Sequence, residues 1–153
     1  MSAATIRRLE TRDLDGVLAI ESAALPWAAR WTPESYLPGS DPGMCAWVAE
    51  RDGWIAGFVL ARYAGGEMEV LNLAVAEAAR RTGVGRALVR AALAEGEARG
   101  AAQAFLEVRE SNAGAIEFYA RLGFSAIGRR TPYYQAPVED ALILSVPLPG
   151  RGN

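Results

Sequence analysis

The sequence contains no histidine among its 153 residues. This absence excludes Ser-His-Asp and Cys-His catalysis, the usual zinc sites and any imidazole general base. Proton transfer would have to fall to carboxyl, phenol, thiol or amine groups, or to water. The chain can therefore be an enzyme only if its chemistry proceeds without an imidazole.

Cysteine is nearly absent too, because Cys45 is the only one. A lone cysteine excludes an intrachain disulfide and a metal site built from several cysteines, and we expect Cys45 to be a small apolar residue in a strand rather than a reactive thiol. No apolar run approaches the roughly 20 residues of a membrane span, and the first residues lack the apolar stretch of a signal peptide. These features predict a cytoplasmic protein that does not bind membranes.

Neither sign of charge dominates, since 18 acidic and 16 basic residues give a net charge of -2. That balance argues against a nucleic-acid-binding protein that relies on overall charge. The length is typical of one domain with a workable core. We expect a single domain over residues 1–148, followed by a flexible tail at 149–153.

The stretch from Val70 to Gly100 predicts a strand, a tight turn and a long helix. Apolar and small polar residues alternate over Val70–Val75, which is typical of a strand. From Val84 onward, apolar residues recur at the spacing of one broad helix face. Gly100 lies where a helix end in the left-handed conformation favours glycine.

The turn between this strand and helix reads Arg80-Arg81-Thr82-Gly83-Val84-Gly85-Arg86. Gly83 and Gly85 remove side chains where the first helical N–H groups are unpaired, so an anion could approach bare backbone. The helix dipole and the arginines add positive potential. The Walker and dinucleotide patterns are both absent, because neither a Lys-Ser/Thr pair nor a third glycine follows at the required spacing.

The rest of the chain predicts the element order βααβββαβαββ. Thr11 is expected to cap a helix over Arg12–Ala24, a short helix follows Thr32, and Ser111 or Asn112 caps a helix that closes at Gly123. Asp52-Gly53 and Gly65-Gly66 predict tight turns between antiparallel strands. The remaining strands are predicted at Ala4–Leu9, Met44–Arg51, Trp54–Ala64, Glu67–Val75, Ala102–Val108, Phe124–Arg130 and Asp140–Pro147. This order indicates an α/β (α+β) fold in which one βαβ unit joins an antiparallel meander.

Three segments carry a resemblance to a known family. Arg80–Gly85 matches the pattern R-x-x-G-x-G, Phe105–Phe124 reads FLEVRESNAGAIEFYARLGF, and Arg129–Leu144 reads RRTPYYQAPVEDALIL. Together they resemble the GCN5-related N-acetyltransferase (GNAT) superfamily, and the second segment closely resembles its RimI branch of protein N-terminal acetyltransferases. The likeness extends from Ile6 to Pro147.

The resemblance implies a GNAT fold, with a central, mixed, mostly antiparallel sheet, a βαβ unit and helices on both faces. It implies acetyl transfer from acetyl-CoA, without a metal, to the N-terminal α-amine of a protein, with a ribosomal protein as acceptor. We expect a monomer or a weak homodimer. Two rival interpretations are a GNAT enzyme for a small-molecule amine or a lysine side chain, and a GNAT-like module that binds CoA without turnover.

By resemblance, Glu107 is the candidate general base and Tyr119 the candidate general acid for the departing thiolate. Flanked by apolar neighbours in a strand, Glu107 is expected to be partly desolvated; the alternative is an outward-pointing side chain paired with Arg109 or another arginine. For Tyr119 the alternative is packing in the core. Asn112 lies two helical turns before Tyr119 on the same side.

The cofactor-binding and acceptor-binding residues are also implied by the resemblance. The backbone of a splayed strand would bind the pantetheine arm of acetyl-CoA, the glycine loop would bind the diphosphate, and Asn112 and Tyr119 would meet the arm and the thiol. The cofactor set is Leu73, Ala74, Val75, Arg80, Arg81, Thr82, Gly83, Val84, Gly85, Arg86, Asn112 and Tyr119, and the acceptor set is Trp27, Trp31, Glu69, Tyr133 and Tyr134.

Overall fold

The computed structural model describes residues 3–24, 33–37, 39, 41–135 and 138–149. Within these residues, seven strands form one sheet in the order β1-β2-β3-β4-β5-β7-β6. All neighbours are antiparallel except β4 and β5. The strands are β1 (Thr5–Arg8), β2 (Met44–Arg51), β3 (Trp54–Ala64), β4 (Glu67–Val75), β5 (Gln103–Arg109), β6 (Ser125–Gln135) and β7 (Val138–Pro147).

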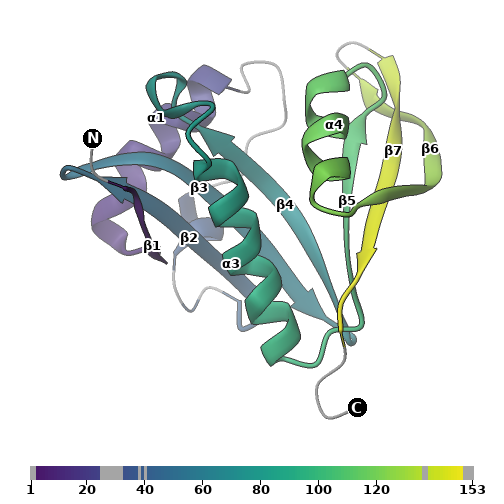
Figure 1. Ribbon diagram of the computed structural model, residues 1–153, viewed down its shortest axis with the longest axis horizontal. Helices are drawn as coiled ribbons and strands as arrows, with labels where there is room; N and C mark the ends of the chain where they lie inside the picture. The colour runs from purple at the N-terminus through teal and green to yellow at the C-terminus, as the bar shows by residue number, and fades with distance from the viewer. Residues whose placement is uncertain (1–2, 25–32, 38, 40, 136–137, 150–153) are drawn as a thin grey trace.

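Helices cover the sheet on both faces (Figure 1). Helices α3 (Val84–Ala98) and α4 (Ala113–Arg121) lie on one face, whereas α1 (Leu14–Ala24) and α2 (Pro33–Tyr36) lie on the other. Each face has its own apolar core, because alternate strand side chains point to opposite sides of the sheet. Leu88, Val89 and Tyr119 belong to the first core, and Val17 and Tyr36 to the second.

Strands β4 and β5 pair only over their first halves. Their parallel register ends at Glu69 and Phe105, although β4 continues to Val75 and β5 to Arg109. On its other edge β4 stays paired with β3 as far as Val75. The two strands diverge beyond their paired ends (Figure 1), so one edge of Val70–Val75 carries backbone N–H and C=O groups without a strand partner. This divergence positions the candidate site.

The predicted element order, the three-stranded meander and the parallel βαβ unit are confirmed. Gly100 and Gly123 follow their helices with positive φ, as expected for these helix ends. Cys45 is buried within β2. In the described residues, no helix has the length and apolar character needed to cross a membrane.

Two local predictions are wrong. Thr11 does not cap α1; instead a 3-10 turn, η1 (Thr11–Asp13), precedes the helix, and the backbone N–H of Glu10 donates to the Asp13 carboxylate at 2.7 Å. The predicted connection at Thr131–Glu139 is mostly strand, because β6 runs to Gln135 and β7 begins at Val138. A proline in this segment misled the prediction, since an edge strand such as β6 can accommodate proline.

Candidate active site

The glycine loop presents bare backbone at the start of α3. Gly83 has a φ of +84° and precedes the helix, and Arg81 has a φ of +64°. A side chain added at Gly83 would meet no protein atom within 4 Å, so the space in front of the loop is open. Because the first N–H groups of a helix have no partner within the helix, this loop can bind an anion.

The side chains of the loop turn in different directions. The Thr82 hydroxyl donates to the Ala79 carbonyl and receives a long hydrogen bond, 3.5 Å, from Nη2 of Arg51. Nε of Arg80 donates to the carbonyl oxygen of Val75 at 3.3 Å. Arg81 and Arg86 line an open groove. Thus only Arg81 and Arg86 of the sequence-predicted loop set line the groove, whereas the side chains of Arg80 and Thr82 donate hydrogen bonds to backbone carbonyls.

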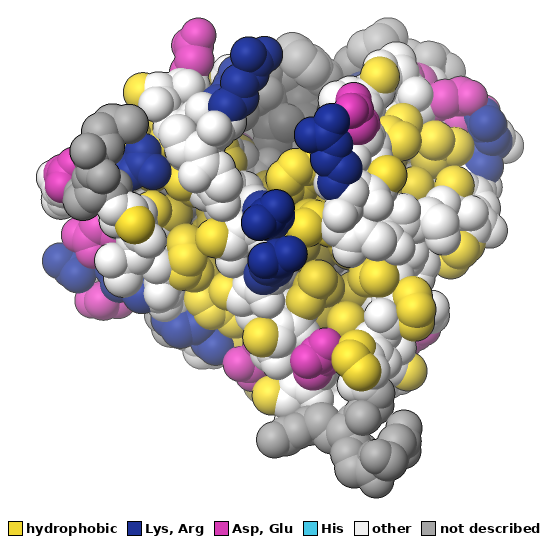
Figure 2. All heavy atoms as spheres, in the orientation of Figure 1, with side chains coloured by type: hydrophobic (Ala, Val, Ile, Leu, Met, Phe, Trp, Pro, Cys, Tyr) yellow, Lys and Arg dark blue, Asp and Glu magenta, His cyan; other side chains and the backbone are white. Residues whose placement is uncertain are grey.

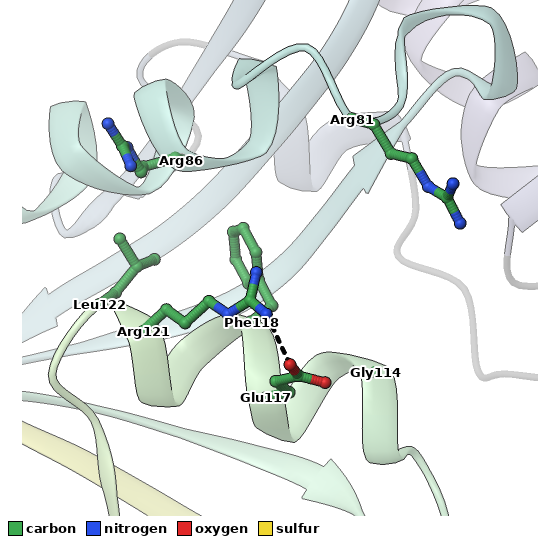
Figure 3. A pocket seen from close by; sticks show the side chains of 7 residues that line it. All are labelled: Arg81, Arg86, Gly114, Glu117, Phe118, Arg121 and Leu122. Atoms are coloured by element: carbon green, nitrogen blue, oxygen red, sulfur yellow. Dashed lines mark hydrogen bonds and ion pairs between the residues drawn. The ribbon is translucent and has the colours of Figure 1, made fainter.

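The groove has a volume of about 600 Å³ and lies between the start of α3 and the outer side of α4. Arginine side chains gather over the middle of this face (Figure 2). Arg86 projects from α3 near Arg121 and Phe118 of α4, whereas Arg81 lies toward the other end of the groove (Figure 3). Its full lining is Arg81, Arg86, Gly114, Glu117, Phe118, Arg121 and Leu122.

Sequence reasoning missed the contribution of α4 to this groove. Arg121 forms an ion pair with Glu117 at 2.6 Å, one helical turn away. Phe118 lies against the loop, and a Cβ added at Gly85 would be 3.4 Å from its ring. The (i, i+4) spacing of Glu117 and Arg121 signalled a surface pair, but nothing in the pattern indicated that α4 would lie against α3.

Asn112 and Tyr119 occupy the start and the buried side of α4. The Asn112 side-chain oxygen accepts from the N–H of Ala115 at 3.1 Å, which confirms Asn112 as the helix cap. The ring of Tyr119 packs edge-on against Phe118 and Phe124. Burial raises the pKa of the Tyr119 phenol, so the group stays protonated at neutral pH.

The diverging edge of β4 completes this side of the site. Leu73, Ala74 and Val75 pair with β3 on one edge only, since the pairing with β5 stopped at Glu69. Their side chains are apolar, and Leu73 and Val75 pack against the same core as α3. The polar groups that they offer toward the gap are therefore those of the backbone.

The other side of the sheet places acidic side chains beside the same gap. Leu106 and Val108 belong to the core beneath α3 and α4, so the alternation of β5 directs Glu107 to the opposite face. The same argument applies to Glu69, which lies between the buried Met68 and Val70. The structure thus brings two sequence-predicted carboxylates to one face.

Glu107 has a cationic partner. Its Oε1 is 2.9 Å from Nε of Arg130 on β6, and its side chain is 10% exposed. The alternative expected from the sequence, an ion pair with an arginine, is therefore what the structure contains, while Arg109 pairs with Glu139 at 3.3 Å instead. The pair with Arg130 leaves Glu107 close to the gap and limits its exposure to water.

The side chains of Glu69 and Tyr133 both have raised pKa values. Burial, followed by repulsion from Glu107, raises the pKa of Glu69. A hydrogen bond to Glu107, followed by burial, raises the pKa of Tyr133. Two carboxyl groups and a phenol thus lie together on this face, with the Arg130 guanidinium paired to Glu107.

The structure describes little of the remaining sequence-predicted acceptor residues. The backbone of Tyr134 pairs with Glu139 in the β6–β7 ladder. Trp27 and Trp31 lie outside the described residues. In the described part of the chain, acidic residues and Cys45 form no group of three or more that could hold a metal ion.

Known proteins resemble this chain in sequence and in fold. The sequence model of the Acetyltransferase (GNAT) family matches residues 6–124. The [ribosomal protein bS18]-alanine N-acetyltransferase of Escherichia coli K12 is 35% identical over 146 residues, covering 94% of this chain and 97% of that protein.

Solved structures agree with the sequence comparison. The crystal structure of the ribosomal-protein-S18-alanine N-acetyltransferase from Escherichia coli has a TM-score of 0.83 and 34% identity, and the match covers 98% of each chain. The crystal structure of a nourseothricin acetyltransferase has a TM-score of 0.80 and 31% identity, with 97% of this chain and 100% of that chain covered.

Proposed function

The chain belongs to the GNAT family and is an acetyl-CoA-dependent N-acetyltransferase, and we propose that its acceptor is the N-terminal α-amine of a protein. A ribosomal protein is the proposed acceptor, because the Escherichia coli relative is named for alanine acetylation of ribosomal protein bS18. An acceptor of this kind implies that the enzyme works in the cytoplasm.

One observation carries the proposal: the gap between β4 and β5 separates two chemically different faces. The glycine loop, Asn112 and Tyr119 lie on the side of α3 and α4, while Glu69 and Glu107 lie on the other. A thioester that enters from the first side and an amine that enters from the second would meet in the gap. Such an arrangement keeps the two reactants in line and brings the attacking nitrogen close to the carbonyl carbon.

The loop and the strand edge fit acetyl-CoA. The N–H groups around Gly83 and Gly85, with Arg81 and Arg86, would bind the diphosphate. The edge of Leu73, Ala74 and Val75 that has no strand partner would bind the amides of the pantetheine arm, as an added strand does. Acetyl-CoA supplies an acetyl group activated as a thioester, and the chain supplies its orientation. Arg80, Thr82, Val84 and Asn112 complete the proposed cofactor set.

Proton transfer is assigned to Glu107 and Tyr119. An α-amine has a pKa of about 7.7–8.0 and attacks only when neutral, so Glu107 takes a proton from the amine, directly or through water. The nitrogen lone pair then forms the C–N bond while the C–S bond breaks. Tyr119, which burial keeps protonated, donates its proton to the departing thiolate. The second amine proton leaves the nitrogen for water, water returns a proton to Tyr119, and Glu107 releases its proton to solvent. The products are an acetylated amine and free CoA.

The acceptor residues are proposed to surround the carboxylate face. Glu69 and Tyr133 lie beside Glu107 there, and Tyr134, Trp27 and Trp31 are proposed from the sequence. A protonated N-terminus would be attracted to the two carboxylates before it loses its proton. The peptide that follows the amine would then run along the outer side of β6 and β7.

A small-molecule amine is the second candidate acceptor. The observation that favours it is the nourseothricin acetyltransferase, whose fold matches nearly the whole chain at 31% identity. The cofactor side would be unchanged for either acceptor. The two proposals differ only in what contacts the carboxylate face.

The deciding experiment measures CoA release from acetyl-CoA with a panel of acceptors. The panel contains peptides with free Ala, Ser, Gly or Met N-termini, N-terminally blocked peptides that contain lysine, polyamines and nourseothricin. Turnover confined to free N-termini is expected. Turnover on polyamines, nourseothricin or blocked lysine peptides alone would overturn the proposed acceptor class, and CoA binding without any turnover would support the non-catalytic interpretation.

A further inference from the structure

Arg51 is a buried arginine at the end of β2. It directly precedes the Asp52-Gly53 turn, where an arginine would ordinarily extend into water. In the structure Arg51 is only 7% exposed. Its burial therefore needs an explanation that the hairpin itself does not provide.

The charge of Arg51 is poorly compensated within the protein. Among the described residues, no carboxylate lies within ion-pair distance of its guanidinium group. Its Nε is the one buried side-chain nitrogen or oxygen in the described part of the chain that has no hydrogen-bond partner. Buried guanidinium groups without partners cost stability, so they are rare unless a ligand completes them.

The surroundings of Arg51 are themselves positive. Its Nη2 is 3.5 Å from the Thr82 hydroxyl, within the glycine loop. That loop also contains Arg80, Arg81 and Arg86, none of which forms an ion pair among the described residues. The loop leads into the N-terminus of α3, whose dipole adds positive potential. The charges of the loop beside Arg51 thus disfavour a buried cation unless an anion is bound.

We propose that Arg51 is a positioning residue for the diphosphate of acetyl-CoA. Its charge, buried behind the loop, is compensated when the diphosphate binds in front, and its hydrogen bond to Thr82 supports the loop conformation in which Gly83 has a positive φ. The inference rests on the proposed cofactor site. It adds a residue from β2, 31 positions before Thr82, to a site otherwise formed by β4, α3 and α4.

Replacement of Arg51 should therefore have opposite effects on the stability of the free protein and on its stabilisation by CoA. Removal of the charge in Arg51→Met retains much of the side-chain volume and relieves an uncompensated buried cation, so the free protein should melt at a higher temperature. The same change should reduce the increase in Tm that saturating CoA produces, because less binding free energy is available. A purely structural role for Arg51 would lower the Tm of the free protein instead.

The kinetic test compares acetyl donors with and without a diphosphate. Arg51→Met should raise KM for acetyl-CoA by about tenfold, which is the loss of about 1.4 kcal/mol of binding, while kcat changes little. With S-acetyl-N-acetylcysteamine, a thioester that lacks the diphosphate, the variant should match the wild type. Arg51→Lys should restore part of the lost affinity, and Arg12→Met, which removes an exposed arginine from η1, serves as the control for net charge.

Four outcomes would decide against the inference. Equal loss of activity with both donors, or a lower Tm of the free variant with an unchanged CoA-induced shift, would overturn it. Wild-type affinity of Arg51→Met for CoA in calorimetric titration would also overturn it and leave the proposed function intact. A wild-type protein that binds no CoA would instead overturn the proposed cofactor site and this inference together.

Discussion

The two sides of the β4–β5 gap differ in charge and in the parts of the chain that form them. On the side of α3 and α4, the proposed site for an anion consists of backbone N–H groups at a helix start and of arginines. On the opposite side, the proposed site for an amine consists of Glu69 and Glu107, which lie on separate strands. The first site is mostly local in sequence, and the second depends on long-range pairing. The difference explains why the cofactor side was easier to recognise from the sequence.

The largest effect is expected from Tyr119→Phe, which removes the proposed proton donor on the cofactor side. The ring would still pack against Phe118 and Phe124, so folding should be preserved. Loss of a general acid typically costs 10²–10⁴-fold in rate, and single-turnover acetylation should slow within about that range. CoA affinity should change little. A rate near that of the wild type would assign Tyr119 to the core alone.

Glu107→Gln tests the acceptor side. The rate of acetylation at neutral pH should decrease toward the lower end of the range for a lost general base, about 10²-fold, with little change in CoA affinity. The difference in rate between the variant and the wild type should become smaller above a pH of about 8, where the α-amine is already neutral. Glu110→Gln, which alters an exposed glutamate paired with Arg129 on the same segment, is the matched control. A deficit that is constant across pH would argue against the base assignment.

Gly83→Val tests the role of the glycine loop in binding CoA. A β-branched residue is strained at a φ of +84°, and its side chain would enter the open space in front of the loop. Strain of this kind costs of order 1–3 kcal/mol, so the Kd for CoA should rise by about tenfold or more. Gly65→Val imposes the same strain in the β3–β4 turn, at the other end of β4, where φ is +61°. The control should destabilise the protein without altering its relative CoA affinity; equal Kd values in both variants would contradict the assignment of the loop.

The smallest effect is expected from Glu69→Gln, measured as stability against pH. Because burial and Glu107 raise the pKa of Glu69 in the folded state, ionisation disfavours folding. The stabilising contribution of the protonated form is present below the unfolded pKa of about 4.3 and is lost as pH rises through the folded pKa. Glu69→Gln should therefore raise Tm at pH 7 and leave it nearly unchanged at pH 4. A lower Tm at pH 7 would show that the ionised carboxylate is instead stabilised by its neighbours.

Sequence patterns predicted most of the fold because turn glycines and hydrophobic periodicity are local. The limits of β2, β3 and β4 followed from alternation and from two glycine-containing turns. The segment after Arg130 was mispredicted because β6 continues only by pairing with β7 across the register shift between Arg130 and Tyr134. No local pattern specifies such a pairing at the edge of a sheet.

In the candidate site, contacts between residues far apart in the sequence could not be predicted. The sequence indicated Glu107 as a residue near the cofactor, but it did not identify the arginine that pairs with Glu107. The structure supplies Arg130 from a different strand. Nothing in the sequence predicted the burial of Arg51, since an arginine before an Asp-Gly turn is ordinarily exposed.

The sequence by itself determined the glycine loop, the ends of α3 and α4 and the order of the elements along the chain, since each depends on backbone conformations that neighbouring residues impose. Only the tertiary structure decided which side chains share a space: Arg51 with Thr82, Phe118 with Gly85, and Glu107 with Arg130. The physical reason is that β4 and β5 separate after Glu69 and Phe105. Where the ladder ends, packing from distant elements sets the contacts.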